Sequence, residues 1–422
     1  MRHLHGRRAR RHHDARRRLA RRGGTVALLA VVGPGLLAGL SDDDPAGITT
    51  YSILGADHGY RLLWVLTAST AALILFHELG ARLGVVTGHG LLSLVRDRAG
   101  KRAAFALLVP LVVANLGTAC AEFAGVGASL ELAGVSPQIS VPIAAVGVTA
   151  LVLGAGFHRV EHVLLALSAV FVTYVIAGVL AHPDWGAAGR GLVVPSVPGT
   201  RAGVLAVVAA IGTTLAPWGL AFIGSYAADK RVPVDELGYE RADVVVGSLL
   251  TGVIGLFVVV ACAATLHGHP IDDARDAAAA LEPVAGHLAA LLFGAGLLGA
   301  ALLAASVVPL STAYSVSEAA GHGGRLDDGW SEAPVFHGTY VAVVACAAGL
   351  VLIPGAPLIR ILYLTQALNA ILLLPVLWVI RRLALDRQLM GTHALSRRGA
   401  AVTAAVFAAI AACVIALAWF SI

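Results

Sequence analysis

Charged side chains are scarce in this chain, and so are cysteine and methionine. Asp, Glu, Lys and Arg make up 13% of the 422 residues, whereas 58% are hydrophobic and the mean hydropathy is +0.82. A soluble domain needs a polar surface, and this composition cannot supply one. We therefore expect a polytopic membrane protein without a separate soluble domain.

The few sulfur-containing residues exclude two kinds of site. Four cysteines lie far apart and inside apolar runs, so neither disulfides nor a cysteine metal site is expected, and we interpret them as small packing residues. They are Cys120, Cys262, Cys346 and Cys413. Methionine occurs only as Met1 and Met390, at the N-terminus and in an expected loop. No apolar run therefore contains a thioether.

Hydrophobic runs recur along the whole chain, each long enough to cross the hydrocarbon core, which takes about 20 residues. They are continuous rather than alternating, and they are rich in Ala, Leu and Gly, which favours helices over barrel strands. The fold class is therefore an all-α polytopic membrane protein with 11 transmembrane helices. The runs are 24–57 (interrupted), 62–81, 104–130, 138–157, 162–181, 201–228 (interrupted), 243–266, 284–319, 337–354, 357–380 and 400–421.

The distribution of Lys and Arg predicts the orientation, because positively charged loops stay in the cytoplasm. With the N-terminus inside, all but five of the 30 Lys and Arg residues fall on the cytoplasmic side. We predict a multi-pass protein of the plasma membrane, with a cytoplasmic N-terminus and an extracytoplasmic C-terminus. The basic tail 1–23 is expected to be disordered and to contact anionic lipid rather than nucleic acid. Residues 24–422 are expected to form a single transmembrane domain.

Two of the apolar runs are interrupted by proline and polar residues. In the first run, "DDDPAG", Pro45 removes a backbone donor and Gly47 loosens the helix that follows. The sixth run is interrupted in the same way by Pro217. Unwound backbone at this depth is tolerated where it lines a cavity or is covered by protein. Two breaks in corresponding positions therefore predict a central site whose free carbonyls bind a cation.

The positions of the two breaks also predict an internal repeat. The interrupted runs head two sets of five helices, about 24–182 and about 200–383, and an extra helix follows at about 400–421. Because five helices cross the membrane an odd number of times, the second set is inverted with respect to the first. This 5+5 inverted repeat with broken helices is typical of secondary transporters.

Three carboxylates precede the first break. A carboxylate at the bilayer centre costs on the order of 3 kcal/mol, and a bound cation would compensate for that cost. Successive helical residues point about 100° apart, so the three cannot all face one ion. We predict that Asp44, which adjoins the break, binds the metal directly. Asp43 is expected to meet the ion through water, and Asp42 to be solvated in a vestibule.

Several motifs, in order along the chain, resemble the NRAMP family of divalent-metal transporters. "GPGLLAGLSDDDPAG" is similar to the family's first helix, which ends in DPGN, and "HELGARLGVVTGHGL" (77–91) to its second helix and loop. "ACAEFAGVGASL" resembles the third helix, and "LTQALNAILLLPVLWVIRRLALDRQLMG" (364–391) the tenth. The resemblance covers nearly the whole chain after the tail. It implies the fold of the leucine transporter, alternating access, a metal site between helices one and six, and no enzymatic activity.

The resemblance also implies a set of metal ligands by position. Thr213 would offer its backbone carbonyl, Gly47 stands where the family has Asn, and Ala216 stands where it has Met. The implied metal residues are Asp44, Asp43, Gly47, Thr213, Ala216 and Gln366. Two alternatives stay open: the Thr213 hydroxyl bonds back to its own helix, and Gln366 bridges helices without touching the ion.

Proton coupling, a property of the general family, has weaker support in this sequence. The family's helix-six histidine is here Trp218, and an acidic position of its third helix is Ala119. Glu122 remains as a candidate proton relay, and the alternative is an ion pair between Glu122 and an Arg from a neighbouring helix.

The missing thioether decides the substrate hypothesis. A thioether favours transition metals, whereas carboxylate, carbonyl, hydroxyl, amide and water oxygens are ligands that Mg²⁺ prefers. The pattern resembles the NRAMP-related magnesium transporter branch, and the sequence hypothesis is import of Mg²⁺, with Mn²⁺ also carried. No bound cofactor and no obligatory protein partner beyond the bilayer is implied.

The sequence leaves three other functions to compare with this hypothesis. The first is a proton-coupled Mn²⁺ and Fe²⁺ importer of the general NRAMP type, and the second is a sodium-coupled amino-acid carrier of the same fold. The third is a membrane enzyme or receptor, for which the sequence offers no nucleophile motif, phosphate loop or metal-hydrolase spacing.

Overall fold

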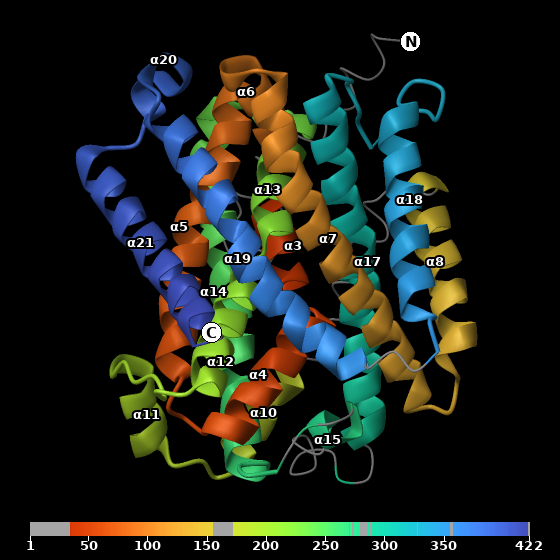
Figure 1. Ribbon diagram of the computed structural model, residues 1–422, viewed down its shortest axis with the longest axis vertical. Coiled ribbons are helices and arrows are strands. Elements are labelled where there is room, and N and C mark those ends of the chain that lie inside the picture. Colours follow the sequence, from red (N-terminus) through yellow and green to blue (C-terminus); the bar gives the residue numbers. More distant parts are fainter. Residues whose placement is uncertain are drawn as a thin grey trace, which may run out of the picture.

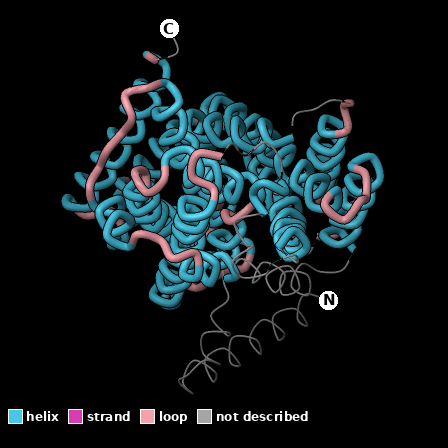
Figure 2. The backbone as a smooth tube through the Cα atoms, turned by 90° about the horizontal axis from the view of Figure 1, so that it is seen from below, coloured by secondary structure: helices cyan, strands magenta, loops and turns pink. Residues whose placement is uncertain are grey.

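The computed structural model describes residues 34–154, 172–269, 271, 274–278, 286, 289–326, 328–354 and 358–420. The basic tail, the start of the first expected span and the first half of the fifth lie outside these residues. Within the described part, all regular structure is helical. Figure 2 looks along the bundle from below and shows many helices nearly end-on, with no strand among them.

The long helices agree with the runs expected from the sequence. Nine spans in the described part are long and apolar enough to cross a membrane, if the two halves of the broken helix at 201–229 count as one. The other eight are α5 (Leu63–Thr87), α7 (Lys101–Glu131), α8 (Pro137–Gly154), α14 (Leu237–Thr265), α17 (Ala289–Ala320), α18 (Pro334–Val351), α19 (Leu358–Leu385) and α21 (Arg397–Trp419). The described end of the fifth run is α10 (Val172–Leu180).

Both predicted interruptions are present. The first run is divided into α3 (Pro34–Ser41) and α4 (Pro45–His58), and the sixth into α12 (Arg201–Thr214) and α13 (Pro217–Asp229). In each case the proline lies in the first turn of the second half, where its missing N–H has no helical partner to lose. The prolines therefore begin new helices instead of kinking continuous ones.

Several short helices in the loops were not expected from the sequence. At one end of the bundle lie α6 (Leu91–Ala99) and α20 (Arg387–Met390), and at the other end lie α11 (Trp185–Val193) and α15 (Ala274–Ala278), as Figure 1 shows. The single-turn 3₁₀ helices are η2 (Val234–Glu236) and η5 (Gly391–His393). The end with α6 and α20 is the one that the Lys and Arg residues predict to be cytoplasmic.

The long helices form two groups around the breaks. In the first group α7, α8, α17 and α18 contact one another, and in Figure 1 α8 and α18 lie together at the right edge. In the second group α14 contacts α3, α4 and α5, while α5 contacts α12 and α13. Helix α19 joins the groups, since it contacts α7 as well as α4 and α12. Both broken helices therefore lie in the interior of the bundle.

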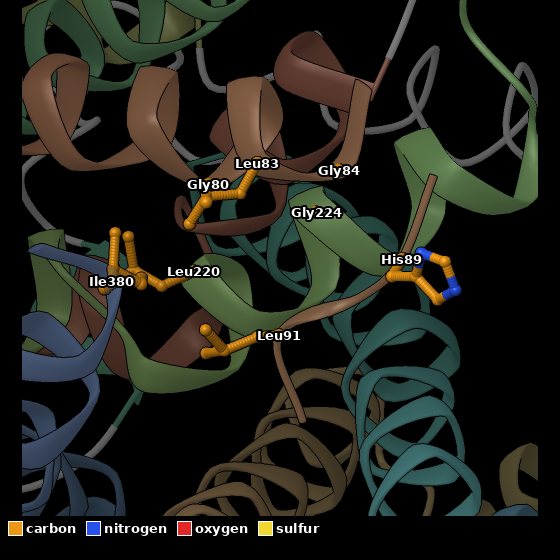
Figure 3. A pocket seen from close by; sticks show the side chains of 8 residues that line it. All are labelled: Gly80, Leu83, Gly84, His89, Leu91, Leu220, Gly224 and Ile380. Atoms are coloured by element: carbon orange, nitrogen blue, oxygen red, sulfur yellow. The ribbon is translucent and has the colours of Figure 1, made fainter. Parts of the chain in front are cut away.

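Helices α5 and α13 meet backbone to backbone. A Cβ built on Gly84 would lie 2.1 Å from the carbonyl oxygen of Gly224, and one built on Gly224 would lie 3.0 Å from that of Gly80. Figure 3 shows the narrow pocket at this crossing, with Gly80 and Gly84 on one side and Leu220 and Gly224 on the other. Small residues are common where membrane helices approach closely. The contact fixes α13 against α5.

We expect Gly84→Val to separate these two helices and to destabilise the fold. Overpacking a close contact costs about 1–3 kcal/mol, so the thermal unfolding midpoint of the purified protein should fall by several degrees. The matched control is Gly147→Val on the exposed face of α8, where an added Cβ meets no atom within 4 Å. Equal midpoints for the two variants would contradict the close packing of α5 on α13.

Candidate metal-binding site

Four helix ends meet at the two breaks. The C-terminal ends of α3 and α12 present backbone carbonyl groups, and their partial negative charge favours a cation. Asp44 is the N-cap of α4, and its Oδ1 accepts a hydrogen bond from the Gly47 N–H at 2.5 Å. Ala216 is the N-cap of α13, and its carbonyl oxygen lies 3.5 Å from the amide nitrogen of Leu220, a long hydrogen bond. These ends are the ligand groups that broken transporter helices use.

Gly47 and Thr213 bring the two breaks together. A Cβ built on Gly47 would lie 2.8 Å from the carbonyl oxygen of Asp42, 3.2 Å from Oδ1 of Asp44 and 3.8 Å from Oγ1 of Thr213. Three oxygens from both broken helices therefore surround the face that lacks a side chain. Asp44 and Thr213 are only 4% and 2% exposed. A larger residue at position 47 would fill this space.

The hydroxyl groups of Thr213 and its neighbour behave differently. Thr214 Oγ1 donates to the carbonyl oxygen of Ala210 at 2.9 Å and lies 3.0 Å from the hydroxyl of Tyr51. Thr213 Oγ1 has no hydrogen-bond partner in the described part of the chain. The alternative in which Thr213 bonds back to its helix is therefore wrong, although it holds for Thr214. Thr213 keeps a free oxygen that faces Gly47.

Helix α7 places a second carboxyl group beside Asp44. A Cβ on Gly125 would lie 2.4 Å from Cβ of Pro45, so this face of α7 packs directly on the first break. Glu122, nearly one turn earlier on the same face, is 0% exposed, and its carboxyl is close enough to that of Asp44 for the charges to repel. No basic side chain pairs with Glu122 among the described residues. The ion-pair alternative therefore has no support in this part of the structure.

Gln366 lies at the level of the second break, but its side-chain amide is already hydrogen-bonded. A Cβ on Gly212 would lie 1.8 Å from the carbonyl oxygen of Gln366, so α19 crosses α12 one residue before Thr213. Oε1 of Gln366 accepts from Nδ2 of Asn369 at 3.0 Å, and this nitrogen also lies 3.0 Å from Oγ1 of Thr118. Gln366 thus links α19 to α7 through Asn369. As a metal ligand it would exchange this hydrogen bond for the ion.

The three consecutive carboxylates face different elements, as expected. Asp44 faces Gly47, and Asp43 lies beside Thr251 of α14, whose hydroxyl donates to the carbonyl oxygen of Gly39. Asp42 lies beside Gly219 of α13, where a Cβ would be 3.6 Å from its Oδ1. The expectation that Asp42 is solvated in a vestibule is wrong, because its side chain is packed between helices and is 1% exposed.

Sequence reasoning missed His77, which the structure places beside Asp42. The Nε2 atom of His77 lies 3.3 Å from the same Cβ position on Gly219, and the residue is 0% exposed. The available signal was an ionisable residue in the middle of an apolar span, which is rare without a function. Trp218, at the family's histidine position, is buried, and its indole nitrogen has no partner in the described part of the chain.

The fold and the paired breaks define the class: a multi-pass membrane transporter with the architecture of the leucine transporter. A sequence profile described as Natural resistance-associated macrophage protein-like matches residues 35–420. The chain therefore belongs to the Nramp family of divalent-metal transporters, as its motifs indicated.

Similar proteins agree with this family and fold. The divalent metal cation transporter MntH of Burkholderia ambifaria is 32% identical over 338 residues, which cover 77% of this chain and 76% of that protein. A manganese transporter of Eremococcus coleocola, solved with an aromatic bis-isothiourea compound, has a TM-score of 0.75 at 19% identity and covers 94% and 87% of the two chains. MhsT with L-phenylalanine has a TM-score of 0.63 at 12% identity, covering 92% of this chain and 98% of its own. The two structures support the fold alone.

We expect Asp44→Asn to abolish metal binding while the fold is retained. Asn is as good an N-cap as Asp, so α4 keeps its capping group, but the buried negative charge is lost. Affinity for Mn²⁺, measured by isothermal titration, should fall at least about tenfold, which is about 1.4 kcal/mol. The matched control is Asp184→Asn, which changes the N-cap of α11 at the exposed end of the bundle. Unchanged affinity in Asp44→Asn would exclude Asp44 as a ligand.

Proposed function

We propose that this protein imports divalent metal ions, with Mn²⁺ as its principal substrate, through the site between the two breaks. The observation that carries the proposal is the cluster of buried oxygens around Gly47, in which Asp44 and Thr213 come from different broken helices. The ligands are Asp44, the unbonded hydroxyl or carbonyl of Thr213 and the carbonyl of Ala216, with Asp43 acting through water. Gln366 joins them after it releases Asn369.

The choice of Mn²⁺ over Mg²⁺ rests on ligand chemistry and on the relatives. Carboxylate, carbonyl and water ligands suit Mn²⁺ as well as Mg²⁺, so the missing thioether does not by itself select magnesium. The similar proteins are named as divalent metal cation or manganese transporters, and they favour the general family activity. Mg²⁺ stays as the second candidate, favoured by Ala216 at the family's methionine position.

The proposal includes alternating access by movement of half-helices. The turns 42–44 and 215–216 separate each pair of helical halves, so one half can tilt while the other keeps its contacts. Asp44 and Thr213 lie at these turns and stay at the centre in either arrangement. The ion therefore binds at the hinge between the two halves.

The proposal assigns the coupled proton to Glu122. Two adjacent buried carboxyl groups cannot both be ionised without a cation, so entry of the metal at Asp44 and loss of a proton from Glu122 are linked. Membrane potential alone supplies a divalent ion with about 4.6 kcal/mol per 100 mV, twice the single-charge value. Transport without proton movement therefore remains energetically feasible in a Glu122→Gln variant.

Uptake into proteoliposomes tests this proposal. With the full-length protein and an inside-negative potential, Mn²⁺ uptake should persist in a tenfold excess of Mg²⁺, about the margin that 1.4 kcal/mol of selectivity provides. The lumen should acidify as Mn²⁺ enters, and this acidification should be absent in Glu122→Gln. Half-inhibition by Mg²⁺ at a concentration well below that of Mn²⁺ would favour the magnesium hypothesis instead. No Asp44-dependent uptake of either ion would overturn both.

We expect Ala216→Met to shift selectivity toward softer ions. The substitution places a thioether at the N-cap of α13, where the ion meets the second break, and thioethers favour soft metals. The ratio of Cd²⁺ to Mn²⁺ uptake should rise on the order of tenfold. Ala216→Leu is the matched control, because it adds a similar volume without sulfur. An equal ratio in the two variants would place residue 216 outside the ligand shell.

A further inference from the structure

A second pair of buried polar groups lies next to the Asp44 site and has no role in it. Asp42 is 1% exposed and His77 is 0% exposed, and neither carboxyl oxygen of Asp42 nor either ring nitrogen of His77 has a hydrogen-bond partner in the described residues. A buried polar group without a partner is unfavourable. Two such groups on one face of α13 could both be satisfied by one bound cation.

Their arrangement indicates where that species would lie. Asp42 follows α3, His77 belongs to α5, and both reach the face of α13 at Gly219. A Cβ on Gly219 would lie 3.3 Å from Nε2 of His77 and 3.6 Å from Oδ1 of Asp42. The ring nitrogen and the carboxylate oxygen thus approach the same face of Gly219, which carries no side chain.

We propose that Asp42 and His77 form a second site for a divalent transition-metal ion, through which the ion passes after it leaves Asp44. The proposal rests on the proposed transport function and deepens it. An imidazole nitrogen and a carboxylate are ligands for first-row transition metals, and waters complete the shell. The ion has only two protein ligands at this site, so its binding is weak enough for release.

The position of the pair fits the direction of import. Asp42 directly follows α3, and Gly219 lies in the first turn of α13. Both half-helices extend from the breaks toward the end of the bundle that carries α6 (Figure 1). The Lys and Arg residues predict this end to be cytoplasmic. An ion released from Asp44 in this direction therefore meets Asp42 and His77 next.

This second site also gives a physical reason for selectivity. Mg²⁺ keeps its waters and prefers oxygen ligands, whereas imidazole is a ligand for later transition metals such as Fe²⁺ and Zn²⁺. The Asp44 site offers only oxygens, so discrimination against Mg²⁺ would come from His77. A His77 variant is expected to lose transition-metal preference while the oxygen site still binds divalent ions.

Pulsed electron paramagnetic resonance on Mn²⁺ tests the proposal with full-length protein in lipid nanodiscs. Electron spin echo envelope modulation detects nitrogen bound to Mn²⁺. The wild type should show nitrogen modulation when more than one Mn²⁺ is added per protein, so that the second site is also occupied. The signal should disappear in His77→Gln and in Asp42→Asn. It should persist in His89→Gln, which removes an exposed histidine near the end of α5 (Figure 3). Identical nitrogen modulation in the wild type and in His77→Gln would overturn the second site.

Transport gives a second readout that separates this inference from the proposed function. His77→Gln should slow Mn²⁺ uptake on the order of tenfold, while Asp44-dependent Mn²⁺ binding by titration is retained. That retained binding also shows that the variant is folded, and Asp42→Asn gives the same comparison if His77→Gln does not fold. Normal uptake in both variants would refute the second site and leave the proposed function intact. Equal Mn²⁺ binding by the wild type and by Asp44→Asn would refute the proposed function itself.

Discussion

The burial of four carboxyl groups around the first helix break is the constraint on which this structure depends. Asp42, Asp43, Asp44 and Glu122 are each at most 4% exposed, and an isolated carboxylate at this depth costs on the order of 3 kcal/mol. The broken helices reduce that cost locally, because Asp44 caps the N-terminus of α4, and the partial positive charge of that helix end stabilises the carboxylate. In the proposed function, the rest of the compensation comes from protons or metal ions. Binding of the transported ion and relief of buried charge are then one process.

Sequence patterns predicted the spans and breaks because these depend on local chemistry. An apolar run of sufficient length crosses the membrane whatever its neighbours are. Pro45 and Pro217 have polar or glycine residues nearby and begin new helices, whereas Pro110 lies inside the continuous helix α7. The short helices α6 and α11 were missed because neither has enough length or apolar residues to stand out. The burial of Asp42 and its approach to His77 and Gly219 were also missed, since they arise from packing among helices distant in sequence.

The proposed ligand set combines hard oxygens with the neighbouring imidazole of His77. Methionine is excluded by composition, and the sequence alone therefore favoured magnesium. The buried His77 changes that balance, because a borderline nitrogen ligand lies next to the oxygen site without belonging to it. In the proposed mechanism, Asp44 and Thr213 provide affinity for divalent ions in general, whereas the proposed Asp42 and His77 site provides discrimination among them.

The glycine crossing between α5 and α13 has a mechanical consequence. With no side chain between Gly84 and the Gly224 carbonyl, the two helices pack backbone to backbone, which favours their movement as one unit. His77 and Gly219 belong to these two helices, whereas Asp42 follows α3, which packs on α14. Any tilt of α3 relative to α13 would therefore change the distance between the carboxylate and the imidazole.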